Sequence, residues 1–223
     1  MLFRSSQGRQ SRRVIGASNS NVINIANVLT VSRVVLALIT LAMLFLAPLA
    51  AKNTWYWTAF VLTGIVIWAD GLDGFFARKL NQCTKLGGIL DIASDRAVEL
   101  AYWISFTALG WIGVWVPLVF LIRGTFVDAI RAHALEEGKT AFGAQTMMNT
   151  PLGKFVVASP FSRFTYAVVK AFAFALMIAA HIPDLAGVLW LAPTAEGLVW
   201  ASVIFCLVRG LPVIWEAQDI FKV

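Results

Sequence analysis

The stretch Asp70-Gly-Leu-Asp73-Gly-Phe-Phe-Ala-Arg, followed after eight residues by Gly87-Gly-Ile-Leu-Asp91-Ile-Ala-Ser-Asp95, places four carboxylates at fixed spacing within an otherwise apolar region. On helices, the acids of each pair lie on one face, because they are three or four positions apart. Two such faces brought together form a carboxylate cluster of the kind that binds cations. Acids buried in a membrane protein are costly, so four of them indicate a chemical role.

The composition indicates a membrane protein. Hydrophobic residues make up 59% of the chain and charged residues 13%, whereas a soluble domain is closer to half apolar and a quarter charged. Several apolar runs reach the roughly 20 residues that cross a bilayer, and backbone groups in lipid must bond internally, which requires helices here. We predict an all-α integral membrane protein, a bundle of six transmembrane helices at about 27–49, 55–78, 89–110, 113–134, 164–183 and 195–215.

The distribution of basic residues predicts the orientation of this bundle. Residues 1–24 form a short basic cytoplasmic segment without acids, and residues 25–223 form one six-helix membrane domain. Lysine and arginine favour the cytoplasmic side, so both termini and the two basic connections are expected there. The carboxylates then lie near the cytoplasmic ends of the second and third spans. The residues behind this prediction are Arg4, Arg9, Arg12, Arg13, Lys79, Lys85, Lys139 and Lys154.

The net charge of +6 is explained by this bias and by attraction to anionic lipids, so we expect membrane lipids and no nucleic acid as partners. A bacterial inner membrane is the expected location, with the active site on its cytoplasmic side. The N-terminal segment is rich in arginine and serine, which leaves a mitochondrial presequence, and the mitochondrial inner membrane, as an alternative.

The chemistry of the carboxylates narrows the choice of metal. All four ligands are oxygens, which select Mg²⁺, Mn²⁺ or Ca²⁺ over zinc or copper. Two acid pairs suit two divalent ions, and sites with two metals typically serve phosphoryl chemistry.

The pattern Asp-x2-Asp-Gly-x2-Ala-Arg-x8-Gly-x3-Asp-x3-Asp resembles the signature of the CDP-alcohol phosphatidyltransferase family, and every position of it is present. The resemblance implies a homodimeric integral membrane enzyme that needs Mg²⁺ or Mn²⁺, with two ions expected. Such an enzyme moves a phosphatidyl group from a CDP-linked lipid onto an alcohol and releases CMP.

The same resemblance assigns roles to individual residues. Asp70, Asp73, Asp91 and Asp95 would be metal ligands, and Asp95 would also be the general base. The segment Asn27-Val-Leu-Thr30, with Arg33 after it, resembles one that helps to cover the nucleotide in the family, although a capped helix start explains it equally well. The pocket for the CDP-lipid would further comprise Gly74, Ala77, Arg78, Thr84 and Gly87.

The acceptor alcohol is predicted from basic residues in the last three spans. Arg131, Arg163 and Arg209 resemble in position the residues that grip phosphorylated acceptors in related enzymes, and snorkelling to lipid headgroups is their alternative role. The sequence of residues 77–87 looks most like the corresponding segment of phosphatidylglycerophosphate synthases, which favours CDP-diacylglycerol and glycerol 3-phosphate as substrates. Ile92 and Arg96 depart from the Pro and Lys common in that branch.

Other readings stay open at this point. Asp95-Arg96-x2-Glu99 looks more like the branch that uses inositol phosphate, and serine or phosphatidylglycerol (as in cardiolipin synthesis) are further candidate acceptors. Arg96 is expected to contact either the acceptor or Glu99, and Asp128 is a further candidate partner for the arginines of the bundle. Intramembrane acids also occur in cation or proton transporters, but these acids gather at one face of the membrane and no inverted repeat is visible.

Overall fold

The computed structural model describes residues 25–50, 53–79, 85–136 and 146–219, which form helices and no strands. Two short helical turns follow the fourth long helix, α5 (Pro151–Gly153) and the π-helical η1 (Lys154–Ala158), and two 3-10 turns are η2 (Pro183–Leu185) and η3 (Ala217–Asp219). The long helices are α1 (Ile25–Ala50), α2 (Asn53–Lys79), α3 (Lys85–Ala108), α4 (Trp115–Glu136), α6 (Pro160–Ala179) and α7 (Leu191–Glu216).

Each long helix overlaps one of the predicted segments. α3 and α6 are displaced toward the N-terminus, and α7 begins before the predicted residue 195 but ends at Glu216, close to the predicted limit of 215. α6 begins at Pro160, directly after the extended residue Ser159, because proline is well accommodated in the first turn of a helix. It ends at Ala179, and Pro183 opens the next turn. The predicted span of 164–183 therefore began and ended too late.

The membrane prediction is confirmed in its coarser form. Three stretches are long and apolar enough to cross a membrane, namely Asn27–Ala50, Pro160–Ala179 and Leu191–Glu216, and the search covered the described residues only. The helices α2, α3 and α4 carry most of the charged residues discussed below. Large apolar side chains such as Leu38, Phe126 and Ile204 are more than half exposed, as expected where a helix faces lipid. The chain is thus an all-helical integral membrane protein with three candidate spanning helices in its described part.

The long helices form a bundle around an aromatic core, and long helices that are consecutive in sequence run in opposite directions. α1 packs against α2 and α3, α6 against α7 and α2, and α4 against α7 and α3. Tyr102 and Trp103 of α3 contact Phe174 of α6, with ring centroids 4.8 and 4.6 Å apart. These rings, together with Phe106, join the first half of the chain to the second.

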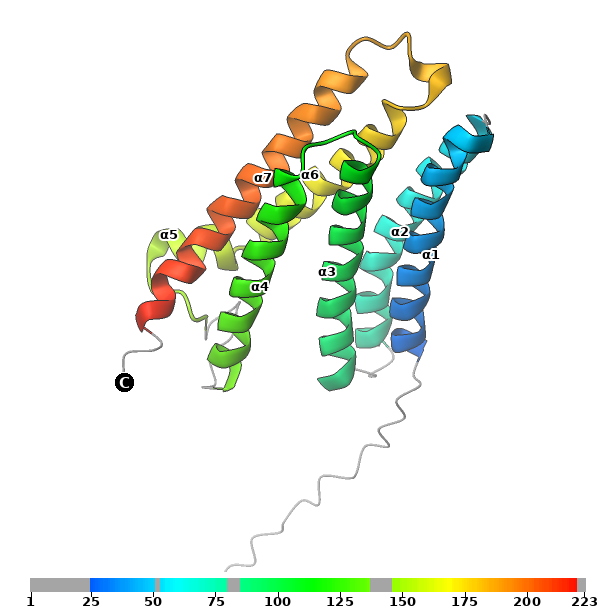
Figure 1. The fold of residues 1–223 in the computed structure, drawn as a ribbon. Coiled ribbons are helices and arrows are strands. Elements are labelled where there is room, and N and C mark those ends of the chain that lie inside the picture. The colour runs from blue at the N-terminus through cyan, green and yellow to red at the C-terminus, as the bar shows by residue number, and fades with distance from the viewer. Residues whose placement is uncertain (1–24, 51–52, 80–84, 137–145, 220–223) are drawn as a thin grey trace, which may run out of the picture.

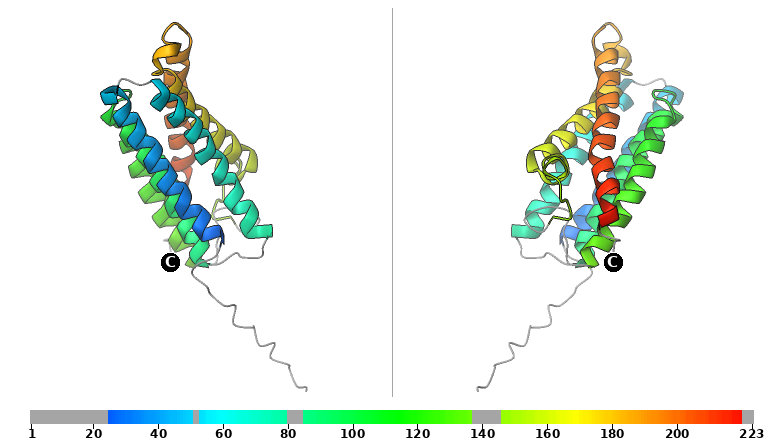
Figure 2. Two further views of the ribbon diagram at one scale, coloured as in Figure 1. Left: turned by 90° about the vertical axis from the view of Figure 1, so that its right-hand side faces the viewer. Right: turned by 90° about the vertical axis from the view of Figure 1, so that its left-hand side faces the viewer.

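The start of α1, the end of α2, the start of α3 and the ends of α4 and α7 all lie at one end of the molecule (Figure 1, Figure 2). The connections from α3 to α4 and from α6 to α7 lie at the opposite end. The carboxylate stretch, at the end of α2 and the start of α3, therefore belongs to the first end, which is the end predicted to face the cytoplasm.

α3 ends two residues earlier than the predicted limit of 110, because Gly110 adopts a positive φ of 77°. The Gly110 N–H donates to the Thr107 carbonyl and the Trp111 N–H to the Phe106 carbonyl, both at 2.9 Å. This pair of bonds is the Schellman arrangement, which favours glycine in the left-handed position.

The segment before α6 is fixed by Glu216, a buried carboxylate at the end of α7. Its oxygens accept hydrogen bonds from the Asn149 N–H and the Thr150 hydroxyl, each at 2.5 Å. Thr150 in turn caps α5 by accepting from the Gly153 N–H at 3.0 Å. The end of α7 and the entry to α6 are therefore held together by polar contacts.

Candidate active site

Arg33 of α1 brings together one acid from each predicted pair. Its Nη1 pairs with Asp70 of α2 and its Nη2 donates to Asp95 Oδ1 of α3 at 2.6 Å. The Arg33 side chain is buried, whereas the carboxylates of Asp70 and Asp95 are about half exposed, at 50% and 48%. Two acids that are 25 positions apart thus converge on one guanidinium. Arg33 of α1 thus links one acid of each predicted pair, and the packing of α1 against both α2 and α3 allows it to do so.

Helical geometry gives the position of the second acid of each predicted pair. Asp91 lies one turn before Asp95 on α3, and the backbone of Asp73 lies one turn after Asp70 on α2. The side chain of Asp73 lies outside the described part of the structure. Among the described side chains, no group of three or more acids, histidines or cysteines is gathered into a metal site.

The other residues predicted around the CDP-lipid lie at the same end of the bundle. Gly87 is in the first turn of α3 and is half-buried. The backbones of Gly74, Ala77 and Arg78 belong to the last two turns of α2, and their side-chain environment is outside the described part. Thr84 lies outside the described residues altogether.

Asn27, Thr30 and Arg33 follow one another at three-residue spacing in the first turns of α1, and all three are buried, at 7%, 4% and 4% exposure. They therefore form one inward face of the helix, whose third member contacts the carboxylates. A helix cap would require only the first residue of this segment, so the burial of Thr30 and Arg33 is a feature beyond capping.

A second charged cluster begins at the residue after Asp95. Arg96 donates through Nε to Asp128 Oδ2 of α4 and through Nη1 to Glu99 Oε2, both at 2.8 Å. The expected contact of Arg96 with Glu99 is thus confirmed. Glu99 also accepts from Lys170 Nζ of α6 at 2.6 Å, a pairing that the sequence analysis missed. The signal for it was a single lysine within the apolar sequence of α6.

The three arginines predicted for the acceptor come from different helices. Arg131 of α4 lies 3.9 Å from Asp128 Oδ1. Arg163 is exposed in the first turn of α6. Arg209 of α7 is buried, and its terminal nitrogens donate to the Val156 and Val157 carbonyls at 2.8 and 3.1 Å and to the Ser162 hydroxyl at 2.5 Å. These hydrogen bonds hold η1 against α7.

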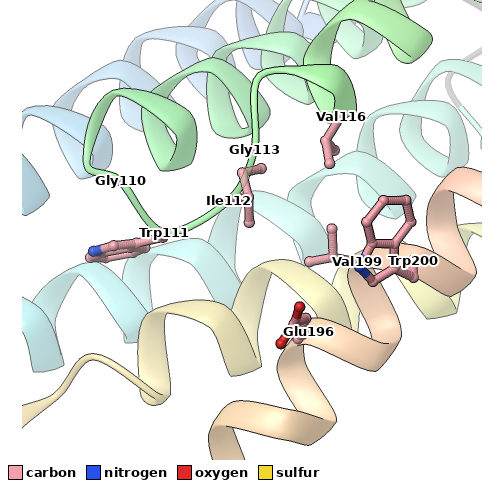
Figure 3. Close-up of a pocket in the computed structure, with 8 residues that line it drawn as sticks. All are labelled: Gly110, Trp111, Ile112, Gly113, Val116, Glu196, Val199 and Trp200. Atoms are coloured by element: carbon pink, nitrogen blue, oxygen red, sulfur yellow. The ribbon is translucent and has the colours of Figure 1, made fainter.

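A pocket of about 380 Å³ lies at the opposite end of the bundle (Figure 3). The α3–α4 connection and the start of α7 line it, through Gly110, Trp111, Ile112, Gly113, Val116, Glu196, Val199 and Trp200. It is separated from the carboxylates by most of the length of α3, and it contains none of the predicted site residues.

The carboxylates suit a divalent cation on chemical grounds. Asp70 and Asp95 offer oxygen donors that hard cations such as Mg²⁺ prefer, and in the fold both already surround one positive charge, that of Arg33. Their half exposure keeps them accessible to an ion and to a diphosphate. The donor set therefore fits the metal that the family resemblance implies.

Comparison with known proteins identifies relatives of this chain. A "Putative cardiolipin synthase" of Mycobacterium tuberculosis is 36% identical over 118 residues, 53% of this chain and 52% of the relative. A "CDP-diacylglycerol--glycerol-3-phosphate 3-phosphatidyltransferase" of Aquifex aeolicus is 36% identical over 107 residues, 48% of this chain and 56% of the relative. The enzyme of that name from Pseudomonas fluorescens is 31% identical over 164 residues, 69% of this chain and 82% of the relative.

The aligned part thus spans about half the length of the first two relatives and most of the third. The model of the CDP-alcohol phosphatidyltransferase family matches residues 23–208, which include α1 to α4, α6 and both acid pairs. The chain belongs to the CDP-alcohol phosphatidyltransferase family.

Proposed function

We propose that this protein transfers a phosphatidyl group from CDP-diacylglycerol to glycerol 3-phosphate and releases CMP. The observation that carries the proposal is the convergence of Asp70 and Asp95 on Arg33, because it brings the two halves of the family signature to one point. Two relatives named for this reaction support the choice of substrates.

Asp70, Asp73, Asp91 and Asp95 would hold the divalent metal, Mg²⁺ or Mn²⁺, with two ions expected. When bound, such ions neutralise diphosphate charge and make CMP a better leaving group. Asp95 is the proposed general base and takes the proton of the acceptor hydroxyl. The hydroxyl oxygen then bonds to the phosphorus that carries the lipid, and CMP leaves with the electrons of the broken P–O bond. Asn27, Thr30, Gly74, Ala77, Arg78, Thr84 and Gly87 would bind the CDP-lipid.

The basic residues of the second half favour an acceptor that carries a phosphate. Arg131, Arg163 and Arg209 would bind it, because guanidinium groups match phosphate oxygens in charge and geometry. The relative named as a putative cardiolipin synthase favours a second candidate acceptor, phosphatidylglycerol, with the same transfer chemistry. Inositol phosphate and serine are further acceptors to be tested.

The proposed setting is a bacterial inner membrane with all six long helices spanning the bilayer and the acid pairs on the cytoplasmic side. The ion pairs of Arg96, Glu99, Asp128 and Lys170 support this, because they satisfy within the bundle the charges that make α3 and α4 less apolar than the other spans. A homodimer is expected from the family.

The test is CMP release by the purified protein with CDP-diacylglycerol and Mg²⁺, offered glycerol 3-phosphate, phosphatidylglycerol, inositol 1-phosphate or serine. Selective turnover with glycerol 3-phosphate is the expected result. Asp95→Asn should lower turnover about 10²- to 10⁴-fold, which is the usual contribution of a general base to the rate. Asp184→Asn is the matched control, because Asp184 bonds Asn53 and Trp57 at the opposite end. Cation flux without CMP release would instead indicate a transporter, and full turnover in Asp95→Asn would reject the proposed base.

A further inference from the structure

The pocket at the end of the bundle opposite to the carboxylates has no part in the proposed reaction. Two segments far apart in the sequence line it, residues 110–113 with Val116 on one side and Glu196, Val199 and Trp200 of α7 on the other (Figure 3). Its volume of about 380 Å³ lies in the range of small-molecule sites in proteins. The pocket is therefore large enough for a small organic ligand.

Glu196 supplies the charge of this pocket. The residue is exposed, and it forms no ion pair or hydrogen bond with the described residues. Another acid at this end, Asp184, already accepts hydrogen bonds from Asn53 Nδ2 at 2.5 Å and Trp57 Nε1 at 3.0 Å. Lys52, which precedes Asn53 in sequence, lies outside the described residues. Glu196 is thus the carboxylate that can pair with a ligand.

The end of α3 adds negative potential to the pocket. α3 has 24 residues and no basic residue in its last turn, and the carboxyl end of a helix carries a partial negative charge. Gly110, the residue at which the chain turns after α3, is part of the pocket wall. The described residues 104–118 and 176–200, which belong to this end of the bundle, contain no lysine or arginine. The pocket therefore favours a cation.

Aromatic side chains form part of the pocket wall. Trp200 follows Glu196 by one helical turn on α7, so the indole and the carboxylate are neighbours on one face of the helix. Trp200 is 54% exposed, and a cation beside Glu196 can therefore also contact the face of its indole ring. On the side of the α3–α4 connection, Trp111 is held by His181 and Phe106, with ring centroids 3.9 and 5.3 Å away. The pocket thus combines a carboxylate with aromatic walls.

The remaining walls indicate which kind of cation fits. Ile112, Val116 and Val199 offer only apolar side chains. A divalent ion such as Ca²⁺ takes six or more oxygen ligands, whereas the described side chains of the pocket offer one carboxylate. An ammonium group bonded to carbon can pair with a carboxylate and an aromatic ring, while its hydrocarbon part packs against apolar walls. The pocket is therefore suited to an organic ammonium ion.

Exposed tryptophans place the pocket at the surface of the bilayer. Trp115, at the start of α4, and Trp190, directly before α7, are 72% and 62% exposed. Trp115 adjoins Val116 of the pocket wall. Tryptophan is enriched at the level of the lipid headgroups, because its ring is apolar and its N–H is polar. The cations that a membrane presents at this level are the ammonium groups of its lipids.

We propose that this pocket binds the ammonium headgroup of a phospholipid of the ethanolamine class. Glu196 pairs with the nitrogen of the headgroup, and the Trp200 ring covers it. The bound headgroup contacts both the α3–α4 connection and α7, so it holds these two segments together at the end remote from the carboxylates. The inference goes beyond the proposed reaction and shares with the proposed function only the membrane setting.

The experiment compares thermal unfolding of the wild type, Glu196→Gln and Trp200→Leu in micelles of a nonionic detergent. The probes are ethanolamine hydrochloride, with sodium chloride at equal ionic strength as the reference, and phosphatidylethanolamine or phosphatidylglycerol in mixed micelles. Asp184→Asn controls for the loss of an acid at the same end of the bundle, and Trp115→Leu controls for the loss of an exposed tryptophan outside the pocket lining. Half-saturating concentrations are read from the rise in the unfolding midpoint.

We expect ethanolamine and phosphatidylethanolamine to stabilise the wild type and both control variants, with equal half-saturating concentrations. Glu196→Gln should need about ten- to a hundredfold more of either ligand, because the charge-assisted hydrogen bond is lost. Trp200→Leu should need about two- to fivefold more, because the cation–π contact is lost. Phosphatidylglycerol carries no ammonium group, so its effect should be smaller and the same in Glu196→Gln as in the wild type.

Stabilisation by phosphatidylethanolamine alone, lost in Glu196→Gln, would also support the inference. Stabilisation by free ethanolamine but not by the lipid would overturn it, and so would equal responses of Glu196→Gln and the wild type or no response in the wild type. Release of CMP is measured on the same samples. A wild type that releases no CMP but shows the response that depends on Glu196 would support the headgroup site and reject the proposed function, and CMP release without that response would do the reverse.

Discussion

Replacing Glu99 by glutamine removes the carboxylate that pairs with Lys170 in the interior of the bundle. The Glu99 side chain is 6% exposed and that of Lys170 20%, and their charged atoms are 2.6 Å apart. Arg96 would keep its two bonds to Asp128 at 2.8 and 3.4 Å, so Lys170 alone would lose its partner. Leaving one member of a buried pair uncompensated costs about 3–5 kcal/mol, and we expect a loss of unfolding free energy at the lower end of this range.

Lys170→Met should cost less, about 1.5–3 kcal/mol, because Glu99 would keep Arg96. The double variant Glu99→Gln with Lys170→Met should lose less stability than the sum of the single losses, by about 2 kcal/mol, since neither charge is then left alone. The assay is reversible unfolding in mixed micelles with increasing dodecyl sulfate, followed by circular dichroism. Additive losses, to within about 0.5 kcal/mol, would refute the idea that this pair is a coupled unit.

Three further outcomes can be checked. Mg²⁺ should raise the thermal unfolding midpoint of the wild type, and EDTA should reverse this rise. Asp95→Asn should need about tenfold more Mg²⁺ for the same rise, since one metal ligand is lost. His181 stacks on Trp111 with ring centres 3.9 Å apart, and burial lowers the pKa of its imidazole. The unfolded chain therefore binds more protons, so the free energy of unfolding should fall as the pH drops below about 6.5. His181→Gln should flatten this pH dependence in unfolding curves measured across the pH range. Gly153→Ala should cost about 1–3 kcal/mol in chemical unfolding, because the new methyl group would collide with the Glu216 carboxylate.

The long helices could be predicted from the sequence because each is an apolar run of the length that a bilayer requires. Their ends were less predictable. The limits of α3 and α6 depend on Gly110 and on Pro160, whose effects are local and do not alter the hydropathy of the run. The turns α5 and η1 could not be foreseen, because their position depends on a carboxylate, Glu216, that is distant in sequence.

The candidate site could be predicted where spacing along one helix decides the geometry. Asp91 and Asp95 share a face of α3 for this reason. Contacts between helices required the fold. Helical spacing gives no information on which helix lies opposite, so the pairing of Lys170 with Glu99 could not be inferred. The same limit applies to Arg209, whose terminal nitrogens bind peptide carbonyls of η1.

The position of Arg33 also bears on how such a chain enters a membrane. Acids that leave water during insertion must either take up protons or find a cation. Since Arg33 belongs to α1, it is synthesised before Asp70 and Asp95 and is already in place as a cation when the later helices arrive. The protein thus carries an internal counter-ion that offsets part of the charge of these two carboxylates within the bundle.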